Sequence, residues 1–305
     1  MQDYGYYIFE GGPYRKDYVI DLIEDLGGVV IQEFIMGLDL VMFIAIPRVD
    51  LNKFLRLASE FKARLREAKL IGSEIAVVPP SMSFRHLPHP TCDINEYLRR
   101  HGAKTFMVGL SRGVGQKRAM LTSYERDFLN EVDAAVFIMG NVSECIKRKS
   151  ELLRGLRIPV VIVGGPQKVD LSSDVAYVGG LGRISHRLKL SHEVKILDQL
   201  VEVLGKILDR RREEFLEDPP PFPPVLLKRE VERQIEEVKD VTVLKIDGLR
   251  VPLNYDKYHE VVGNVIVEGY RLRDVAEIKR SVLKDQILVK LLPESAIDLV
   301  HFNYA

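Results

Sequence analysis

Residues 134–163 contain two short apolar runs, Ala134-Ala-Val-Phe-Ile-Met139 and Pro159-Val-Val-Ile-Val163, with a helical pattern over residues 143–153 between them. A strand that is apolar at every position is typical of a sheet covered on both faces. Because a helix connects the two runs, we expect them to be parallel, as in a β-α-β unit. This stretch therefore predicts an α/β domain built on a parallel sheet.

The same alternation of helices and apolar runs continues on both sides of this stretch, and we assign residues 81–217 to the α/β domain. Further strands are expected at residues 105–110 and 176–178, and further helices at residues 95–101, 124–131 and 193–215.

Residues 1–80 have a different order of elements. We expect strands at residues 4–10, 29–36, 38–46 and 74–78, and helices at residues 17–26 and 50–61. The order βαββαβ is that of a ferredoxin-like sandwich. The sequence therefore predicts an N-terminal α+β domain whose fourth strand is residues 74–78.

Residues 218–224, Asp218-Pro-Pro-Pro-Phe-Pro-Pro224, contain five prolines. Such a stretch forms neither a helix nor a central strand, so we interpret it as a stiff spacer. Beyond it, Asp247-Gly248 between two apolar runs predicts a β-hairpin. We expect residues 225–305 to form a small α+β docking module.

The overall composition describes a globular protein with balanced charge, having 44 basic and 44 acidic residues and 46% apolar residues. A balanced chain has no overall field that would attract nucleic acid or an anionic membrane. The sequence has no apolar run of membrane-spanning length and no export signal at its N-terminus. Two cysteines suit a reducing compartment, so we expect a cytoplasmic protein.

Residues 84–93, Phe84-Arg-His-Leu-Pro-His-Pro-Thr-Cys-Asp93, carry several side chains that can bind metals. The two prolines favour extended backbone, and His86, His89 and Cys92 occur at every third position. Imidazole and thiolate are ligands for borderline and soft metals. A proline-rich connection whose histidines hydrogen-bond to the backbone is the alternative explanation, and the sequence leaves both open.

Cys145 is the second cysteine of the chain. An N-cap at Asn141 or Ser143 would place it in the first turn of the helix after residues 134–139, where the helix dipole favours a thiolate. Ligands of parallel sheets bind beyond the carboxyl ends of the strands. Cys92 and Cys145 are therefore candidates for one shared site or for two adjacent sites.

Four glycine-bearing loops are expected at the same edge of the sheet. They match neither the dinucleotide fingerprint nor the phosphate loop. Their backbone amides and basic side chains can meet an anionic ligand, and tight turns with solvated basic residues are the alternative. The candidate cofactor-binding residues are Gly113, Gly115, Gly179, Gly180, Gly182 and Arg183.

Several segments resemble the methanogenesis marker protein 7 family of methane-metabolising archaea. The specific one is His86-Leu-Pro-His-Pro-Thr-Cys-Asp-Ile94. Gly27-Gly28, Gly109-Leu-Ser-Arg-Gly-Val-Gly115 and Ala176-Tyr-Val-Gly-Gly-Leu-Gly-Arg-Ile184 support it. The resemblance extends from the N-terminus to the proline stretch.

This resemblance implies a non-catalytic subunit of the ATP-dependent complex that activates methyl-coenzyme M reductase by reducing the nickel of its tetrapyrrole. The implied partners are the reductase, operon protein C, other methanogenesis marker proteins and an ATP-binding component. The implied cofactor is a complex iron–sulfur cluster, related to nitrogenase cofactor precursors, that relays low-potential electrons.

Two cysteines cannot ligate an ordinary cubane, which takes four thiolates, so the cluster would be shared with a partner subunit. We expect Cys92 as the main ligand and Cys145 as the second, with His86 or His89 as the imidazole. The alternatives are a metal-free scaffold of the same complex and a small-molecule or nucleotide-binding α/β enzyme.

Overall fold

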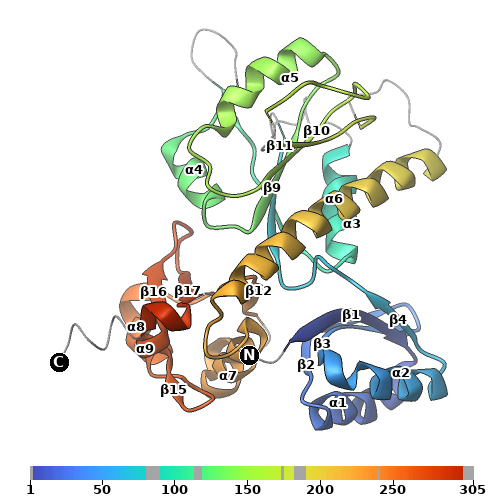
Figure 1. Cartoon of the computed structure of the whole chain (residues 1–305), viewed down its shortest axis with the longest axis vertical. Coiled ribbons are helices and arrows are strands. Elements are labelled where there is room, and N and C mark those ends of the chain that lie inside the picture. Colours follow the sequence, from blue (N-terminus) through green and yellow to red (C-terminus); the bar gives the residue numbers. More distant parts are fainter. Residues whose placement is uncertain are drawn as a thin grey trace. The chain divides into compact units, whose positions relative to one another are not determined.

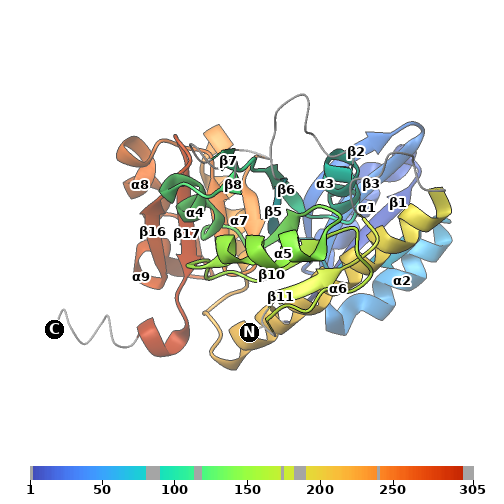
Figure 2. The same cartoon turned by 90° about the horizontal axis from the view of Figure 1, so that it is seen from above.

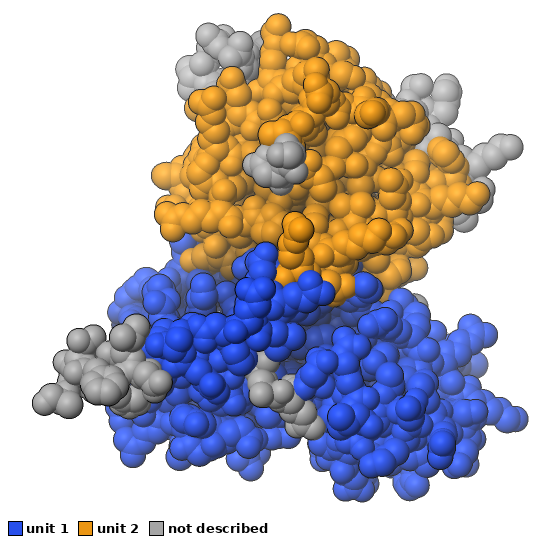
Figure 3. Space-filling model, viewed as in Figure 1, with its two compact units in different colours: residues 1–72, 211–305 blue, residues 73–210 orange. Residues whose placement is uncertain are grey.

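A computed structural model, drawn in Figures 1 and 2, describes residues 3–79, 90–112, 119–172, 175–181, 190–238 and 241–297. The chain divides into two compact units (Figure 3). The first consists of Met1–Gly72 and Arg211–Ala305, and the second of Ser73–Arg210. The expected mixture of helices with parallel and antiparallel sheets is confirmed.

The N-terminal part of the first unit is a ferredoxin-like sandwich, as predicted. Its elements are β1 (Tyr4–Gly11), a short 3-10 helix (Pro13–Arg15), α1 (Lys16–Asp25), β2 (Val29–Met36), β3 (Asp39–Pro47), a second 3-10 helix (Arg48–Asp50), α2 (Leu51–Glu60) and β4 (Arg64–Glu67). The strands form an antiparallel sheet in the order β2-β3-β1-β4. Helices α1 and α2 cover one face of this sheet, where Ile23, Ile44 and Phe54 are buried in one apolar cluster.

The prediction that residues 74–78 form the fourth strand of the sandwich was wrong. β4 takes that place, with Leu65 opposite Phe9 of β1, whereas Glu74–Val78 forms β5 of the second unit. β4 is a mostly exposed edge strand, but every residue of β5 is buried. A strand buried along its whole length belongs inside a covered parallel sheet, which is where β5 lies.

The C-terminal part of the first unit is a small α+β module. Its elements are α7 (Pro224–Gln234), a 3-10 helix (Glu236–Val238), β12 (Val243–Lys245), β13 (Gly248–Val251), α8 (Tyr255–Gly263), β14 (Ile266–Val267), β15 (Tyr270–Arg271), α9 (Leu272–Val275), β16 (Ala276–Arg280) and β17 (Ile287–Leu291). The sheet order is β12-β13-β17-β16, and β14 pairs with β15. The predicted hairpin is confirmed by the pairing of Lys245 with Gly248. The strand expected over residues 261–267 forms only in part, because residues 261–263 end helix α8 and only residues 266–267 are a strand, β14.

The two ends of the chain share one apolar core in the first unit. Tyr4, Val29 and Ala45 of the sandwich sheet are buried in the same cluster as Val225 of α7. Phe222, inside the proline stretch, is 1% exposed and belongs to this cluster. The proline stretch therefore contributes to the core of the first unit.

The second unit is built on the expected parallel sheet. Its strands are β5, β6 (Lys104–Met107), β9 (Ala134–Ile138), β10 (Val160–Val163) and β11 (Val175–Val178). Its helices are α3 (Pro90–Arg100), α4 (Ser123–Leu129), α5 (Ser143–Lys149), a 3-10 helix (Ser150–Leu153) and α6 (Leu190–Glu217), and the short strands β7 (Ser111–Arg112) and β8 (Ala119–Met120) form a separate pair. The boundary between the units falls inside α6, after Arg210.

The strand order of the parallel sheet is β11-β10-β9-β5-β6. Numbered along the chain, the order is 2-1-3-4-5, which is the flavodoxin-like arrangement. The chain moves from β5 outward to β6 and then returns to β9 on the other side of β5. This reversal defines a topological switch point between β5 and β9, and ligands of such sheets bind outside the carboxyl ends at that point.

Candidate ligand site at the carboxyl edge of the parallel sheet

Each strand at the switch point is followed by a helix that carries one of the two cysteines. Among the described residues, α3 is the next helix after β5, and Cys92 is its third residue. α5 follows β9, and Cys145 is its third residue. Because a helix that follows a parallel strand begins at the carboxyl edge of the sheet, both cysteines lie at the edge where ligands bind.

Both thiols are exposed. The expectation that Cys145 lies in the first turn of a helix is confirmed, but its expected cap is not. The N-cap residue is Val142, whose side chain has no atom that can accept a hydrogen bond. The N-cap side chain of α5 therefore satisfies none of the backbone N–H groups of its first turn.

The expected imidazole ligands, His86 and His89, lie outside the described residues. In the part of the chain that the structure describes, no group of three or more His, Cys, Asp or Glu side chains could hold a metal ion. Among the described residues, the soft donors at this edge are the two exposed thiols, which by themselves do not make a closed four-ligand centre.

The loops after β9, β10 and β11 lie side by side at this edge. The Gly165 N–H donates to the Gly140 carbonyl oxygen at 3.2 Å, and the Leu181 N–H donates to the Gly164 carbonyl oxygen at 3.0 Å. The expected gathering of glycine loops is therefore observed for these three loops. Of the candidate cofactor-binding residues, Gly113, Gly115, Gly182 and Arg183 lie outside the described residues.

The glycines in these loops permit close contacts within the chain itself. A Cβ atom on Gly179 would lie 2.5 Å from the carbonyl oxygen of Pro166. Gly180 has a φ of +92°, which L side chains rarely adopt. By contrast, no atom of the described residues lies within 4 Å of a Cβ placed on Gly140. The close contact with the loop after β10 thus explains why residue 179 is a glycine. No contact with the described residues explains the glycine at position 140.

Tyr177 of β11 fixes the loop after β10. Its hydroxyl donates to the Pro166 carbonyl oxygen at 2.6 Å. Burial raises the pKa of the Tyr177 phenol, so the hydroxyl stays protonated and remains a donor at neutral pH.

Two buried polar atoms of α3 were missed by the sequence analysis. Thr91 is fully buried beside Cys92, and its Oγ1 has no hydrogen-bond partner among the described residues. The Oδ1 atom of Asn95, one turn later, is also buried and also has no hydrogen-bond partner among the described residues. Buried polar atoms of this kind are uncommon and ask for an explanation. The sequence could have indicated these two atoms, because Thr91 and Asn95 are four residues apart and therefore lie on the helix face that also buries Leu98.

The fold and the position of the cysteines define a doubly wound α/β protein with a candidate ligand site at its switch point. A family model described as methyl-coenzyme M reductase operon protein C matches residues 4–265, and the chain belongs to this family. The narrower resemblance to methanogenesis marker protein 7 stays a prediction. We expected operon protein C as a partner, but the family match applies to the chain itself.

A curated relative, an uncharacterized protein of Methanocaldococcus jannaschii, is 47% identical over 295 residues, covering 95% of this chain and 94% of the relative. Solved structures are much less similar. The flavoenzyme FerB of Paracoccus denitrificans is 12% identical with a TM-score of 0.29, covering 45% of this chain and 98% of FerB. A formyltetrahydrofolate deformylase of Pseudomonas putida is 11% identical with a TM-score of 0.25, covering 67% and 57% of the two chains. Within the described residues, no helix is both long and apolar enough to cross a membrane.

Proposed function

We propose that this chain is an accessory, non-catalytic subunit in the activation of methyl-coenzyme M reductase, and that it helps to hold a complex iron–sulfur cluster at the switch point of its parallel sheet. One observation carries the proposal. Each of the two strands at the switch point leads to a helix with an exposed cysteine in its first turn.

The position of the thiols suits cluster binding. A thiolate in the first turn of a helix is stabilised by the positive end of the helix dipole and by free backbone N–H groups. Such N–H groups also donate to the sulfides of a cluster, and hydrogen bonds of this kind tune its reduction potential. In this proposal Cys92 is the main ligand, Cys145 is the second, and His86 or His89 supplies an imidazole.

The exposure of both thiols supports a shared cluster. Two thiolates leave most of the metal ions of a large cluster without a protein ligand. A partner subunit would therefore complete the site, and both sulfurs are accessible to such a partner. We propose that the cluster relays low-potential electrons to the nickel of the reductase, and that ATP binding belongs to a different component of the complex.

The test is metal analysis of the complex purified anaerobically around the full chain. We expect Cys92→Ala to remove most of the bound iron and acid-labile sulfide, and Cys145→Ala to remove a smaller share. Arg99→Gln in α3 and Lys147→Gln in α5 are matched controls because both side chains are exposed on the same helices. The cysteine variants should still assemble with the partners, because exposed thiols contribute little to packing.

Two results would overturn this proposal. Unchanged iron and sulfide in both cysteine variants would exclude the thiols as ligands. A metal-free wild-type complex that activates the reductase normally would instead favour a structural scaffold. The chain expressed without partners should bind little iron, since it supplies only part of the ligand set.

A further inference from the structure

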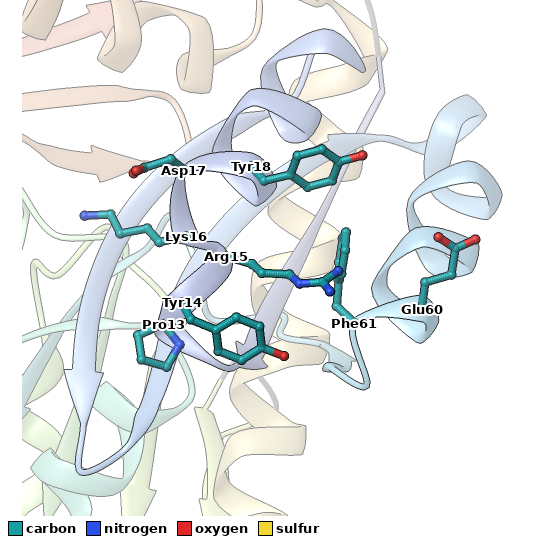
Figure 4. A pocket seen from close by; sticks show the side chains of 8 residues that line it. All are labelled: Pro13, Tyr14, Arg15, Lys16, Asp17, Tyr18, Glu60 and Phe61. Atoms are coloured by element: carbon teal, nitrogen blue, oxygen red, sulfur yellow. The ribbon is translucent and has the colours of Figure 1, made fainter.

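A second candidate site lies in the first unit, at one end of the sandwich. A pocket of about 540 Å³ opens between the turn before α1 and the end of α2 (Figure 4). Pockets of this size hold small organic ligands. The side chains that matter for its chemistry are Tyr14, Arg15, Lys16, Tyr18, Glu60 and Phe61.

An arginine stacked on aromatic rings is the central feature of the pocket. The guanidinium carbon of Arg15 lies 4.9 Å from the ring centroid of Phe61 and 5.7 Å from that of Tyr14. Tyr18 packs edge-on against Phe61, with ring centroids 5.5 Å apart. Stacking holds the flat faces of a guanidinium and leaves the N–H groups at its rim for an acceptor.

The Tyr14 ring packs closely against a glycine in the turn that presents this arginine. A Cβ atom on Gly12 would lie 2.3 Å from a ring carbon of Tyr14. Gly12 caps the 3-10 helix that begins at Pro13, so the Tyr14 ring lies across the backbone of the turn. Tyr14 is nevertheless 77% exposed and Tyr18 is 58% exposed, which leaves two phenol rings available to a ligand.

The two cations of the pocket differ in their partners. The Lys16 ammonium pairs with the Glu33 carboxylate. Arg15 has no carboxylate partner among the residues that the structure describes, although Glu60 lines the same pocket. A guanidinium fork is suited to bidentate binding of a carboxylate or a phosphate. The pocket thus offers one uncommitted fork next to exposed ring surface.

We propose that this pocket binds a small anion with a flat apolar group. The carboxylate or phosphate of the ligand accepts hydrogen bonds from the Arg15 guanidinium, and the flat group packs against Tyr14 and Tyr18. The site is distinct from the cysteine-bearing edge of the parallel sheet, and the inference does not depend on the function proposed above.

Four probes separate the two features of such a ligand. Phenylacetate and phenyl phosphate carry both a ring and an anion, benzyl alcohol carries only a ring, and acetate carries only an anion. Binding to the full-length chain is measured by NMR titration of the tyrosine ring signals. We expect phenylacetate or phenyl phosphate to bind at least about tenfold more tightly than benzyl alcohol or acetate, as the loss of a charge-assisted hydrogen bond predicts. The tighter of the two identifies the anionic group.

Matched variants locate the site. Arg15→Gln should weaken the ring-bearing anions by about tenfold and leave benzyl alcohol nearly unchanged, because it removes the anion partner while the exposed rings of Tyr14 and Tyr18 remain. Lys16→Gln removes the same charge from the same pocket and should leave binding nearly unchanged, because Lys16 is already paired. Equal effects of the two variants, equal binding of benzyl alcohol and phenylacetate, or no saturable binding of any probe would overturn the proposal.

Discussion

The parallel sheet of the second unit and the antiparallel sheet of the sandwich create candidate sites in different ways. All five strands of the parallel sheet end at one edge, so its loops and the first turns of its helices meet there. Strand ends alternate in the sandwich, and its pocket is built from side chains at two helix ends (Figure 4). Backbone topology therefore defines the first candidate site, whereas side-chain stacking defines the second.

The largest expected effect comes from the core beneath the first site. Phe137 of β9 is 1% exposed, and Phe137→Ala should destabilise the second unit by about 3–5 kcal/mol through the lost burial and the cavity. Chemical denaturation followed by amide hydrogen exchange in β9 and β10 measures this change. Protection in β1 and β3 serves as the internal reference. A loss of less than about 1 kcal/mol would contradict a tightly packed central strand.

A smaller effect is expected in the loops of the same edge. Gly179→Ala places a Cβ against the Pro166 carbonyl oxygen, a backbone atom that cannot rotate away, and should destabilise the unit by about 1–3 kcal/mol. Gly140→Ala is the control, because its Cβ would meet open space within the described structure. Thermal unfolding of the two variants compares them directly. Equal midpoints would mean that the loop contacts do not hold the edge together.

The corresponding glycine of the sandwich pocket should be less sensitive. Gly12→Ala also creates a contact, but with the Tyr14 ring, which can turn aside because it is mostly exposed. We expect a stability change below about 1 kcal/mol, together with a clear shift of the Tyr14 ring signals. Denaturation and NMR spectra of the same sample check both parts. A cost as large as that of Gly179→Ala would remove the distinction between backbone-built and side-chain-built sites.

The smallest effect is expected at a surface ion pair of the first unit. A hydrogen bond from Arg280 holds the pKa of the Asp256 carboxyl below its ordinary value of 3.8. A lowered pKa means that any stabilisation is present above pH 3.8 and is lost as the pH falls through the folded-state pKa. Because both groups are exposed, Asp256→Asn should leave stability at neutral pH almost unchanged. Unfolding curves at pH 7 and pH 3 should therefore differ only slightly between variant and wild type.

The sequence predicted the parallel sheet because β9 and β10 are apolar at every position. It missed the role of β5 because β4, with Arg64, Arg66 and Glu67, carries the polar side chains of an edge strand and looks like a loop. The pairing of β4 with β1 depends on a contact between distant segments, which local hydrophobicity does not reveal.

The candidate sites, too, could be predicted from the sequence only where they depend on neighbouring residues. The first-turn position of Cys145 follows from the local order of strand and helix. The switch point between β5 and β9, where the strand order changes direction, depends on how five strands pair across the sheet. It could therefore not be predicted from neighbouring residues. The pocket around Arg15 combines two helix ends that only the folded sandwich brings together.

The division of the chain also has a consequence for biosynthesis. One face of the sandwich sheet, with Tyr4, Val29 and Ala45, shares its core with residues beyond Phe222. A ribosome releases the middle of the chain, Ser73–Arg210, before those residues emerge. We therefore expect the nascent N-terminal segment to carry an uncovered apolar surface while the later unit is already complete, and to depend on chaperone protection until translation ends.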